Sequence, residues 1–114
     1  MSKRESPWYR VAHVADIPRR GARRIEQGGH QIALFRTADD AVFALRDSCP
    51  HKGGPLSAGI VHDDCVTCPL HNWVISLKTG QAQGADSGAT TMYPVRVVEQ
   101  TVMLQLLAQS TVDA

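Results

Sequence analysis

Two short segments of the chain each hold a cysteine and a histidine at a spacing that suits metal binding. The first is Cys49-Pro50-His51, a C-x-H pattern, and the second is Cys68-Pro69-Leu70-His71, a C-x-x-H pattern. Each segment therefore offers one thiolate sulfur and one imidazole nitrogen, which are ligands for transition metals such as iron and zinc. A two-iron, two-sulfur cluster can use this division, because two cysteines can bind one iron and two histidines the other.

The residues around these pairs suit loops that enclose a cluster. Pro50 and Pro69 each follow a cysteine and restrict the backbone there. Gly53, Gly54 and Gly59 allow the backbone to approach closely and to turn. Backbone N–H groups of such loops can donate hydrogen bonds to the negatively charged sulfurs. Apolar side chains that can keep water off part of the cluster follow nearby: Leu56, Leu70 and Trp73.

Zinc is the alternative that the same residues allow. Cys65-x-x-Cys68-x-x-His71 has zinc-like spacing, and Cys49 or His51 can complete a tetrahedral site. Zinc does not account for a Cys-His pair in both segments, and it leaves a fifth candidate ligand unused. In the iron interpretation, Cys65 is a small buried side chain of an apolar strand. No role is assigned to the remaining histidines: His13, His30 and His62.

Short apolar runs separated by turn residues predict an all-β fold. Strands are expected at 8–14, 31–37, 41–46, within 59–67, at 73–76, and at 93–99 and 102–107. Hairpin turns are expected at Asp39-Asp40 and Asp63-Asp64, and a further turn at 78–80. The two candidate ligand segments then fall in loops, at 49–59 and 68–72. Such loops at one end of a rigid sheet scaffold are typical places for a functional site.

The segment from Pro18 to Glu26 is the one place where a short helical turn competes with the β interpretation. Several arginines gather there: Arg19, Arg20, Arg23 and Arg24. They are interpreted as a solvated basic surface, and the alternative is a docking surface for an acidic partner.

The composition limits the classes of function. The chain has 114 residues, 12 Lys and Arg against 11 Asp and Glu, and a net charge of +1, so no general attraction to nucleic acid or anionic lipid is expected. We expect a single domain over 1–114, without signal peptide or membrane span, in the cytoplasm, where cysteines are more often metal ligands or free thiols than disulfides. There is no dinucleotide fingerprint or phosphate loop, so redox function requires a partner.

The stretch from Cys49 to Ala82 reads CPHKGGPLSAGIVHDDCVTCPLHNWVISLKTGQA and resembles the core of the Rieske iron–sulfur family. The resemblance implies a fold of three small antiparallel sheets, with a 2Fe–2S cluster held by two loops. It also implies that Cys49 and Cys68 bind one iron as thiolates, while His51 and His71 bind the other as neutral imidazoles. No catalytic residue is expected on this chain, whose role is one-electron transfer.

Within that family, several segments look most like the small subunit of assimilatory NAD(P)H nitrite reductase. These are CPHKGGPLSAGIV, CPLHNWVI, LKTGQA and YPVRV. This resemblance implies a large partner subunit that carries flavin, a 4Fe–4S cluster and sirohaem, in a complex that reduces nitrite to ammonium. The isolated chain is then expected to be inactive. The alternative is a free Rieske ferredoxin of a ring-hydroxylating dioxygenase system.

The resemblance also implies a low reduction potential. High-potential Rieske proteins carry an extra cysteine in each loop, which form a disulfide, and a Ser and a Tyr hydroxyl that donate to sulfur. The matching positions here are Gly54 and Leu70 for the cysteines, and Trp73 and Ile75 for the hydroxyls. Because hydrogen bonds to sulfur stabilise the reduced cluster, their loss predicts a potential near the low end of the Rieske range.

Overall fold

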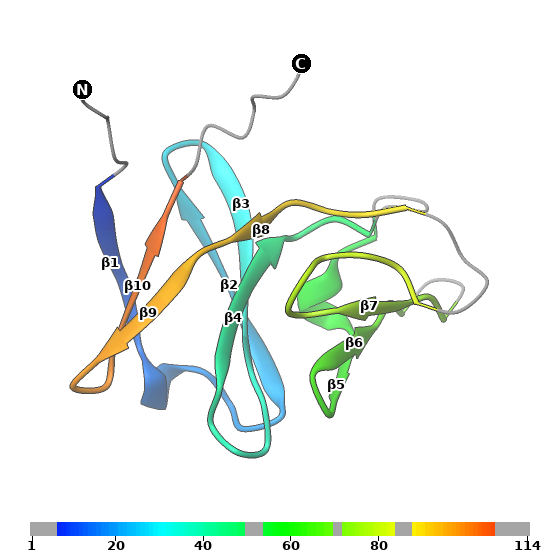
Figure 1. Ribbon diagram of the computed structural model, residues 1–114, viewed down its shortest axis with the longest axis horizontal. Helices are drawn as coiled ribbons and strands as arrows, with labels where there is room; N and C mark the ends of the chain where they lie inside the picture. Colours follow the sequence, from blue (N-terminus) through cyan, green and yellow to red (C-terminus); the bar gives the residue numbers. More distant parts are fainter. Residues whose placement is uncertain (1–6, 50–53, 70–71, 84–87, 107–114) are drawn as a thin grey trace.

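The computed structural model describes residues 7–49, 54–69, 72–83 and 88–106. In these ranges the regular structure consists of ten strands and two single turns of 3-10 helix, with no α-helix. The strands form three antiparallel sheets (Figure 1). The expectation of an all-β fold with three small sheets is therefore confirmed. No helix among the described residues is long and apolar enough to cross a membrane.

A four-stranded sheet forms the centre of the molecule. Its strands, in spatial order, are β2 (Gly21–Gln27), β3 (His30–Arg36), β4 (Val42–Arg46) and β8 (Met92–Tyr93). Strand β3 is buried on both faces: Ile32 and Leu34 point into one hydrophobic cluster, while Ala33 and Phe35 point into the other. This explains why β3 is a continuous apolar run instead of an alternating one.

A three-stranded sheet packs on one face of the central sheet. It contains β1 (Trp8–His13), β10 (Thr101–Gln105) and β9 (Val95–Val98), in that order. A 3-10 turn, η1 (Val14–Asp16), ends β1, and the side chain of His13 caps it. Val102 and Leu104 of β10 pack with Ile32 and Leu34 in the hydrophobic cluster between these two sheets.

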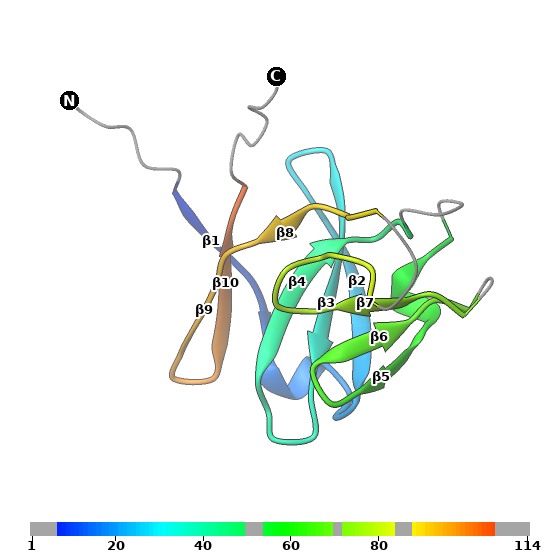
Figure 2. The same ribbon diagram turned by 45° about the vertical axis from the view of Figure 1, so that its right-hand side comes forward.

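A second three-stranded sheet packs with the other face of the central sheet and carries the second candidate ligand loop (Figure 2). It contains β5 (Ile60–His62), β6 (Cys65–Thr67) and β7 (Val74–Ser76), preceded by the 3-10 turn η2 (Leu56–Ala58). The hairpin turns predicted at Asp39-Asp40 and at Asp63-Asp64 are confirmed, because they join β3 to β4 and β5 to β6.

The helical turn considered for 18–26 is wrong, because β2 pairs with β3 over its whole length, from Gly21↔Arg36 to Gln27↔His30. Gly28 and Gly29, both with positive φ, make the two-residue turn of this hairpin. The Gly-Gly pair was the local signal for the strand. Ala22 and Ile25 pack against different hydrophobic clusters, which is the alternation of a strand.

The arginines of this segment lie at the surface, as the solvated interpretation expects. Two of them also bind carboxylates: Arg19 pairs with Asp40, and Arg24 pairs with Asp47. Near the C-terminal end of the chain, the expected 93–99 strand is divided at Pro94, and its first part extends back to Met92 as β8 on the edge of the central sheet.

Candidate metal centre

The first candidate ligand loop begins where the chain leaves the central sheet after β4. Cys49 is buried, with 2% of its surface exposed. Its N–H donates a hydrogen bond to the carbonyl oxygen of Gly54, at 2.7 Å, which brings the two ends of the segment 49–54 together. Pro55 and the turn η2 follow, and they place Leu56 in the core with no exposed surface.

The second candidate ligand loop connects β6 to β7. Cys68 has no exposed surface, and its N–H donates to the carbonyl oxygen of Trp73 at 2.7 Å. Thr67 and Val74 pair just before and just after this bond, so the ladder of the hairpin runs directly into the loop. Both loops therefore close with the same hydrogen bond, from a cysteine N–H to the carbonyl oxygen five residues later.

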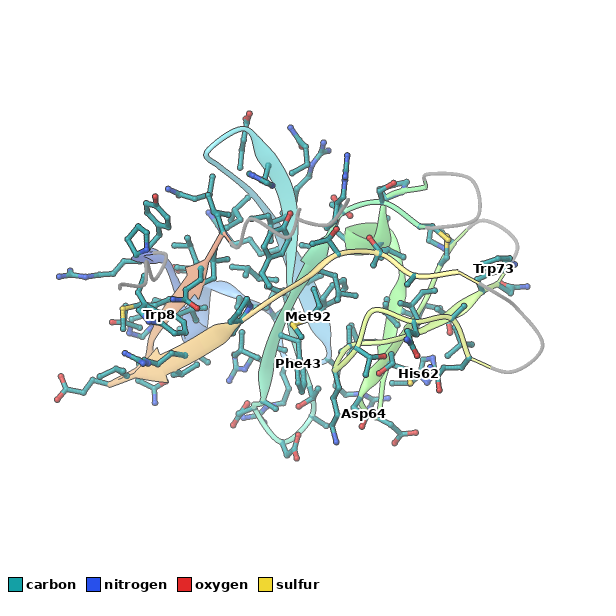
Figure 3. The ribbon with its side chains drawn as sticks, turned by 45° about the horizontal axis from the view of Figure 1, so that its top comes forward. Trp8, Phe43, His62, Asp64, Trp73 and Met92 are labelled. Carbon is teal, nitrogen blue, oxygen red and sulfur yellow. The ribbon has the colours of Figure 1, made fainter. Side chains whose placement is uncertain are left out.

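The structure brings the two loop cysteines into one hydrophobic cluster. Cys49 and Cys68 both belong to the core between the central sheet and the β5–β6–β7 sheet, among Leu56, Val66 and Ile75. Both are free thiols. Trp73 is half-buried and packs against the same cluster, at the end of the molecule that carries the loops (Figure 3). Two thiols in an apolar, water-poor setting suit binding of an iron–sulfur cluster.

Cys65 lies apart from these two thiols. In β6 successive side chains point to opposite faces, and Val66 is the one that points into the core. The sequence predicts a buried Cys65, but this side chain is only half-buried. Its Sγ lies 3.7 Å from the Asp64 carboxylate. Burial, reinforced by the negative charge of Asp64, raises the pKa of the Cys65 thiol above 9.0. Cys65 therefore lies outside the buried cluster that holds Cys49 and Cys68.

The zinc and iron interpretations both need His71, which lies outside the described residues. Among the described residues, no group of three His, Cys, Asp or Glu side chains gathers in a way that can hold a metal ion. His62 instead contacts the hydroxyl of Thr67 at 2.6 Å, and His30 contacts the hydroxyl of Tyr93 at 3.1 Å. His51 and His71 lie outside the described residues, and their role as ligands stays a prediction. The two buried thiols, Cys49 and Cys68, fit the cysteine ligands expected for a 2Fe–2S cluster.

The chain that leaves the first loop contacts the strand before the second loop at Gly59. Gly59 ends η2, and a methyl group at its Cβ position would lie only 2.3 Å from the carbonyl oxygen of Thr67, the residue before Cys68. The chain leaving the first loop therefore touches the strand that enters the second. Its φ of −83° is ordinary, so the requirement for glycine at this position is steric.

Asp47 and Ser57 carry no recognisable functional signal in the sequence, yet they flank the first loop and bind each other. Only the fold reveals this pair, because its members lie ten positions apart in the sequence.

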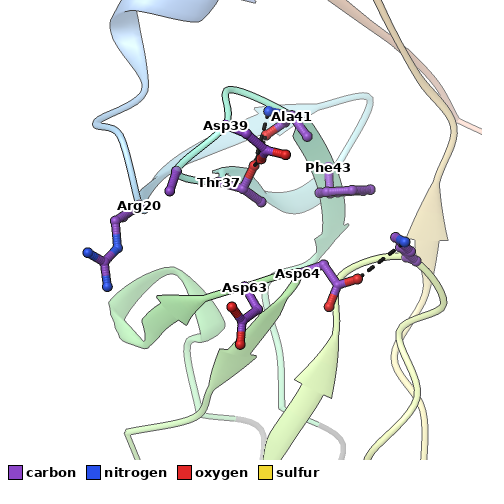
Figure 4. A pocket seen from close by; sticks show the side chains of 9 residues that line it. Arg20, Thr37, Asp39, Ala41, Phe43, Asp63 and Asp64 are labelled. Atoms are coloured by element: carbon purple, nitrogen blue, oxygen red, sulfur yellow. Dashed lines mark hydrogen bonds and ion pairs between the residues drawn. The ribbon is translucent and has the colours of Figure 1, made fainter.

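A cavity of about 570 Å³ lies at the turn between β5 and β6, at the opposite end of these strands from the ligand loops. Figure 4 shows it between the β3–β4 turn and the β5–β6 turn, with Thr37, Phe43 and Asp63 among its lining residues. Lys78 forms a 3.2 Å ion pair with Asp64 on its rim. The cavity is not part of the candidate metal centre.

The fold and the thiol pair define a small all-β domain of the metal-binding, iron–sulfur class. Residues 7–104 match the family model described as the Rieske [2Fe-2S] domain. The chain therefore belongs to the Rieske [2Fe-2S] family: it binds a two-iron, two-sulfur cluster and is an electron-transfer domain.

Two curated relatives are ferredoxin subunits. The chain is 41% identical over 76 residues to the anthranilate 1,2-dioxygenase ferredoxin subunit of Burkholderia cepacia, covering 66% of this chain and 69% of that protein. It is 37% identical over 95 residues to the 3-phenylpropionate/cinnamic acid dioxygenase ferredoxin subunit of Shigella boydii, covering 82% and 88%. By contrast, it spans only 17% of a cholesterol 7-desaturase from Ciona intestinalis, at 37% identity over 76 residues.

Solved structures with the same fold include nitrite reductase subunits. A proposed NADH-dependent nitrite reductase small subunit from Mycobacterium tuberculosis superposes with a TM-score of 0.83 at 25% identity, covering 92% of this chain and 99% of that one. A proposed NADPH nitrite reductase small subunit gives a TM-score of 0.78 at 27% identity, covering 86% and 97%.

Proposed function

We propose that this chain is the Rieske small subunit of an NAD(P)H-dependent nitrite reductase. The observation that carries the proposal is the resemblance of the loop segments HKGGPLSAG and HNWVI, around the two cysteines, to that subunit. The fold is consistent with it, since the chain superposes on nearly the whole length of a proposed nitrite reductase small subunit with a TM-score of 0.83. The proposed unit is one domain over residues 1–114.

In this proposal the cluster is held by Cys49 and Cys68 on one iron and by His51 and His71 on the other. When bound, the cluster supplies one-electron redox chemistry. The buried sides of Cys49 and Cys68 exclude water from the thiolates, and the hydrogen bonds from their own N–H groups to Gly54 and Trp73 hold the loops closed. The chain itself contributes no catalytic residue to nitrite reduction.

The proposed partner is a large subunit that carries flavin, a 4Fe–4S cluster and sirohaem. The flavin would accept electrons from NADH or NADPH, and nitrite would be reduced to ammonium at the sirohaem in a six-electron reaction. We place the complex in the cytoplasm, where both nicotinamide cofactors are regenerated.

A second candidate function is the ferredoxin of a ring-hydroxylating dioxygenase, which would pass single electrons from a reductase to an oxygenase. The identities of 41% and 37% to two dioxygenase ferredoxin subunits favour it. Ligands and fold are the same in both candidates, so the partner alone separates them.

The test combines the cluster-loaded full chain with each class of partner. With a nitrite reductase large subunit from the same genome, we expect nitrite-dependent oxidation of NADH or NADPH and co-purification of the two chains. The chain alone should oxidise neither nucleotide. A Cys49→Ser chain separates two roles. If the cluster transfers electrons, this variant should not support nitrite-dependent oxidation; if the chain only assembles the complex, it should. Electron delivery to an oxygenase, measured as substrate-dependent oxygen uptake, together with no effect on the nitrite reductase subunit, would overturn the proposal.

A further inference from the structure

Asp47 is a buried carboxylate two positions before Cys49. Its side chain has no exposed surface. Among the described residues the buried polar ones are Thr37 and Asp47, so Asp47 is the buried charge. A carboxylate is costly to bury unless hydrogen bonds and an opposite charge compensate for the lost water.

The hydrogen bonds come from the far side of the first ligand loop. The backbone N–H of Ser57 donates to one carboxylate oxygen of Asp47, and the Ser57 hydroxyl donates to the other, each at 2.7 Å. Asp47 precedes the loop and Ser57 follows it, so these two bonds fasten the base of the loop. The hydrogen bond between Cys49 and Gly54 lies within the segment that Asp47 and Ser57 bracket in the sequence.

The compensating charge comes from the neighbouring strand. The Nε atom of Arg24, in β2, lies 3.4 Å from the same Asp47 oxygen that accepts the Ser57 hydroxyl. Arg24 also donates to the side chain of Gln31, at 3.0 Å, and the backbone carbonyl oxygen of Gln31 accepts the N–H of Asp47 at 2.9 Å. Arg24 of β2 therefore compensates the charge of Asp47, and Gln31 of β3 binds its backbone.

We propose that Asp47 is a positioning residue that fastens the first ligand loop, and that the Asp47–Arg24 pair sets the reduction potential of the cluster. The inference rests on Cys49 being a ligand. Reduction adds one negative charge to the cluster. A fixed carboxylate two positions before Cys49 opposes that added charge and lowers the potential, whereas the guanidinium of Arg24 favours it and raises the potential. Exclusion of water strengthens the effect of Asp47, while solvent partly screens Arg24, whose side chain is 59% exposed.

The pair therefore predicts shifts of opposite sign for two changes that each remove one charge. Asp47→Asn keeps the shape of the side chain, and its amide can still accept from the Ser57 N–H and donate to the Ser57 hydroxyl. It should raise the midpoint potential. Arg24→Gln removes the positive charge and should lower it. We expect each change to alter the equilibrium constant for reduction at least threefold, which is about 28 mV at about 59 mV per tenfold for one electron.

The role of the Asp47–Ser57 hydrogen bonds in holding the loop is tested separately from the effect of the Asp47 charge. Ser57→Ala removes the hydroxyl bond but leaves the backbone N–H bond and both charges in place. It should shorten the lifetime of the bound cluster during incubation with a chelator, and it should change the potential less than Asp47→Asn does. Matched controls are Asp40→Asn and Arg19→Gln, which alter an exposed carboxylate–arginine pair at the opposite end of β4. Both controls should leave the potential within twofold of the parent equilibrium.

The experiment is voltammetry and electron paramagnetic resonance of the cluster-loaded full chain at neutral pH. Opposite shifts for Asp47→Asn and Arg24→Gln support the inference. Shifts of the same sign, or shifts no larger than those of the controls, overturn it. If Asp47→Asn fails to load a cluster, Arg24→Gln decides: a lowered potential supports the inference and an unchanged one overturns it. Retention of the Rieske signal in Cys49→Ser would instead overturn the ligand assignment.

Discussion

The two ligand loops close in the same way but are held by different neighbours. In each, a cysteine N–H donates to the carbonyl oxygen five residues later, Gly54 in the first loop and Trp73 in the second, both at 2.7 Å. The second loop is the tip of the β6–β7 hairpin, whose backbone ladder supports it on both sides. Among the described residues, the first loop is not flanked by such a ladder, because it connects β4 and β5, which belong to two different sheets.

The side chains of Asp47 and Ser57 take the place of the missing ladder in the first loop. Two hydrogen bonds that Ser57 donates to the buried carboxylate of Asp47 fasten its base, and Gly59 then brings the departing chain against Thr67. In this comparison, the backbone pairing of a hairpin supports the second loop, whereas a specific polar contact supports the connection between sheets. We expect the first loop to be the more sensitive to single substitutions outside the ligands.

The largest expected effect concerns the ligands themselves. Cys49→Ser in the first loop and His71→Ala in the second should each abolish the Rieske absorption and electron paramagnetic resonance signal, because both loops contribute one ligand to each iron. Cys65→Ser should leave the signal intact, since this side chain lies outside the core cluster that holds Cys49 and Cys68. Loss of the cluster in Cys65→Ser with retention in His51→Ala would contradict the assignment.

The next effect concerns the contact between the loops. Gly59→Ala puts a methyl group 2.3 Å from the Thr67 carbonyl oxygen, so the chain must shift. We expect a loss of about 1–3 kcal/mol in the free energy of unfolding, measured by urea denaturation of the loaded protein. The exposed neighbour supplies the control, since Ala58→Ser should change stability by less than about 0.5 kcal/mol. Equal stability of the two variants would mean that the loops do not press on each other at Gly59.

A third effect concerns the second loop and the potential. Trp73 and Ile75 offer no side-chain hydroxyl at the positions where high-potential Rieske proteins have Ser and Tyr. We therefore expect a midpoint of about −150 to 0 mV, at the low end of the Rieske range. Trp73→Ser should raise it by on the order of 100 mV if the new hydroxyl reaches the sulfur, and Trp73→Ala serves as the control without a hydroxyl. A parent midpoint above about +150 mV in voltammetry would refute the hydrogen-bond explanation.

The smallest effect concerns the exposed carboxylate at the far end of β4, in contrast to the buried Asp47. Hydrogen bonds from Arg19, and next from Arg36, hold the pKa of Asp40 below 3.8. Because the folded-state pKa is lowered, the small stabilisation from Asp40 is present above pH 3.8 and is lost as the pH falls through the lowered value. Titration of the Asp40 carboxyl carbon by NMR should show the low pKa, and Arg19→Gln should move it back toward 3.8. An unchanged value in that variant would exclude Arg19 as the cause.

The sequence by itself determined the parts of this protein that depend on local chemistry. The two Cys-His segments predict the cluster, and turn residues such as Asp39-Asp40 and Asp63-Asp64 predict the hairpins, because a tight turn or a ligand pair needs particular residue types at short spacing. The strand β2 was not predicted; the Gly28-Gly29 turn that follows it is the local signal that could have found it.

Only the tertiary structure decided which distant residues meet. It places Cys49 and Cys68 in one core, separates Cys65 from them, and pairs β8 with β4. It also buries Asp47 against Ser57 and Arg24. The physical reason is that strand pairing and burial depend on neighbours far along the chain: an aspartate in a loop looks solvent-exposed in sequence until the packing of two sheets removes the water around it.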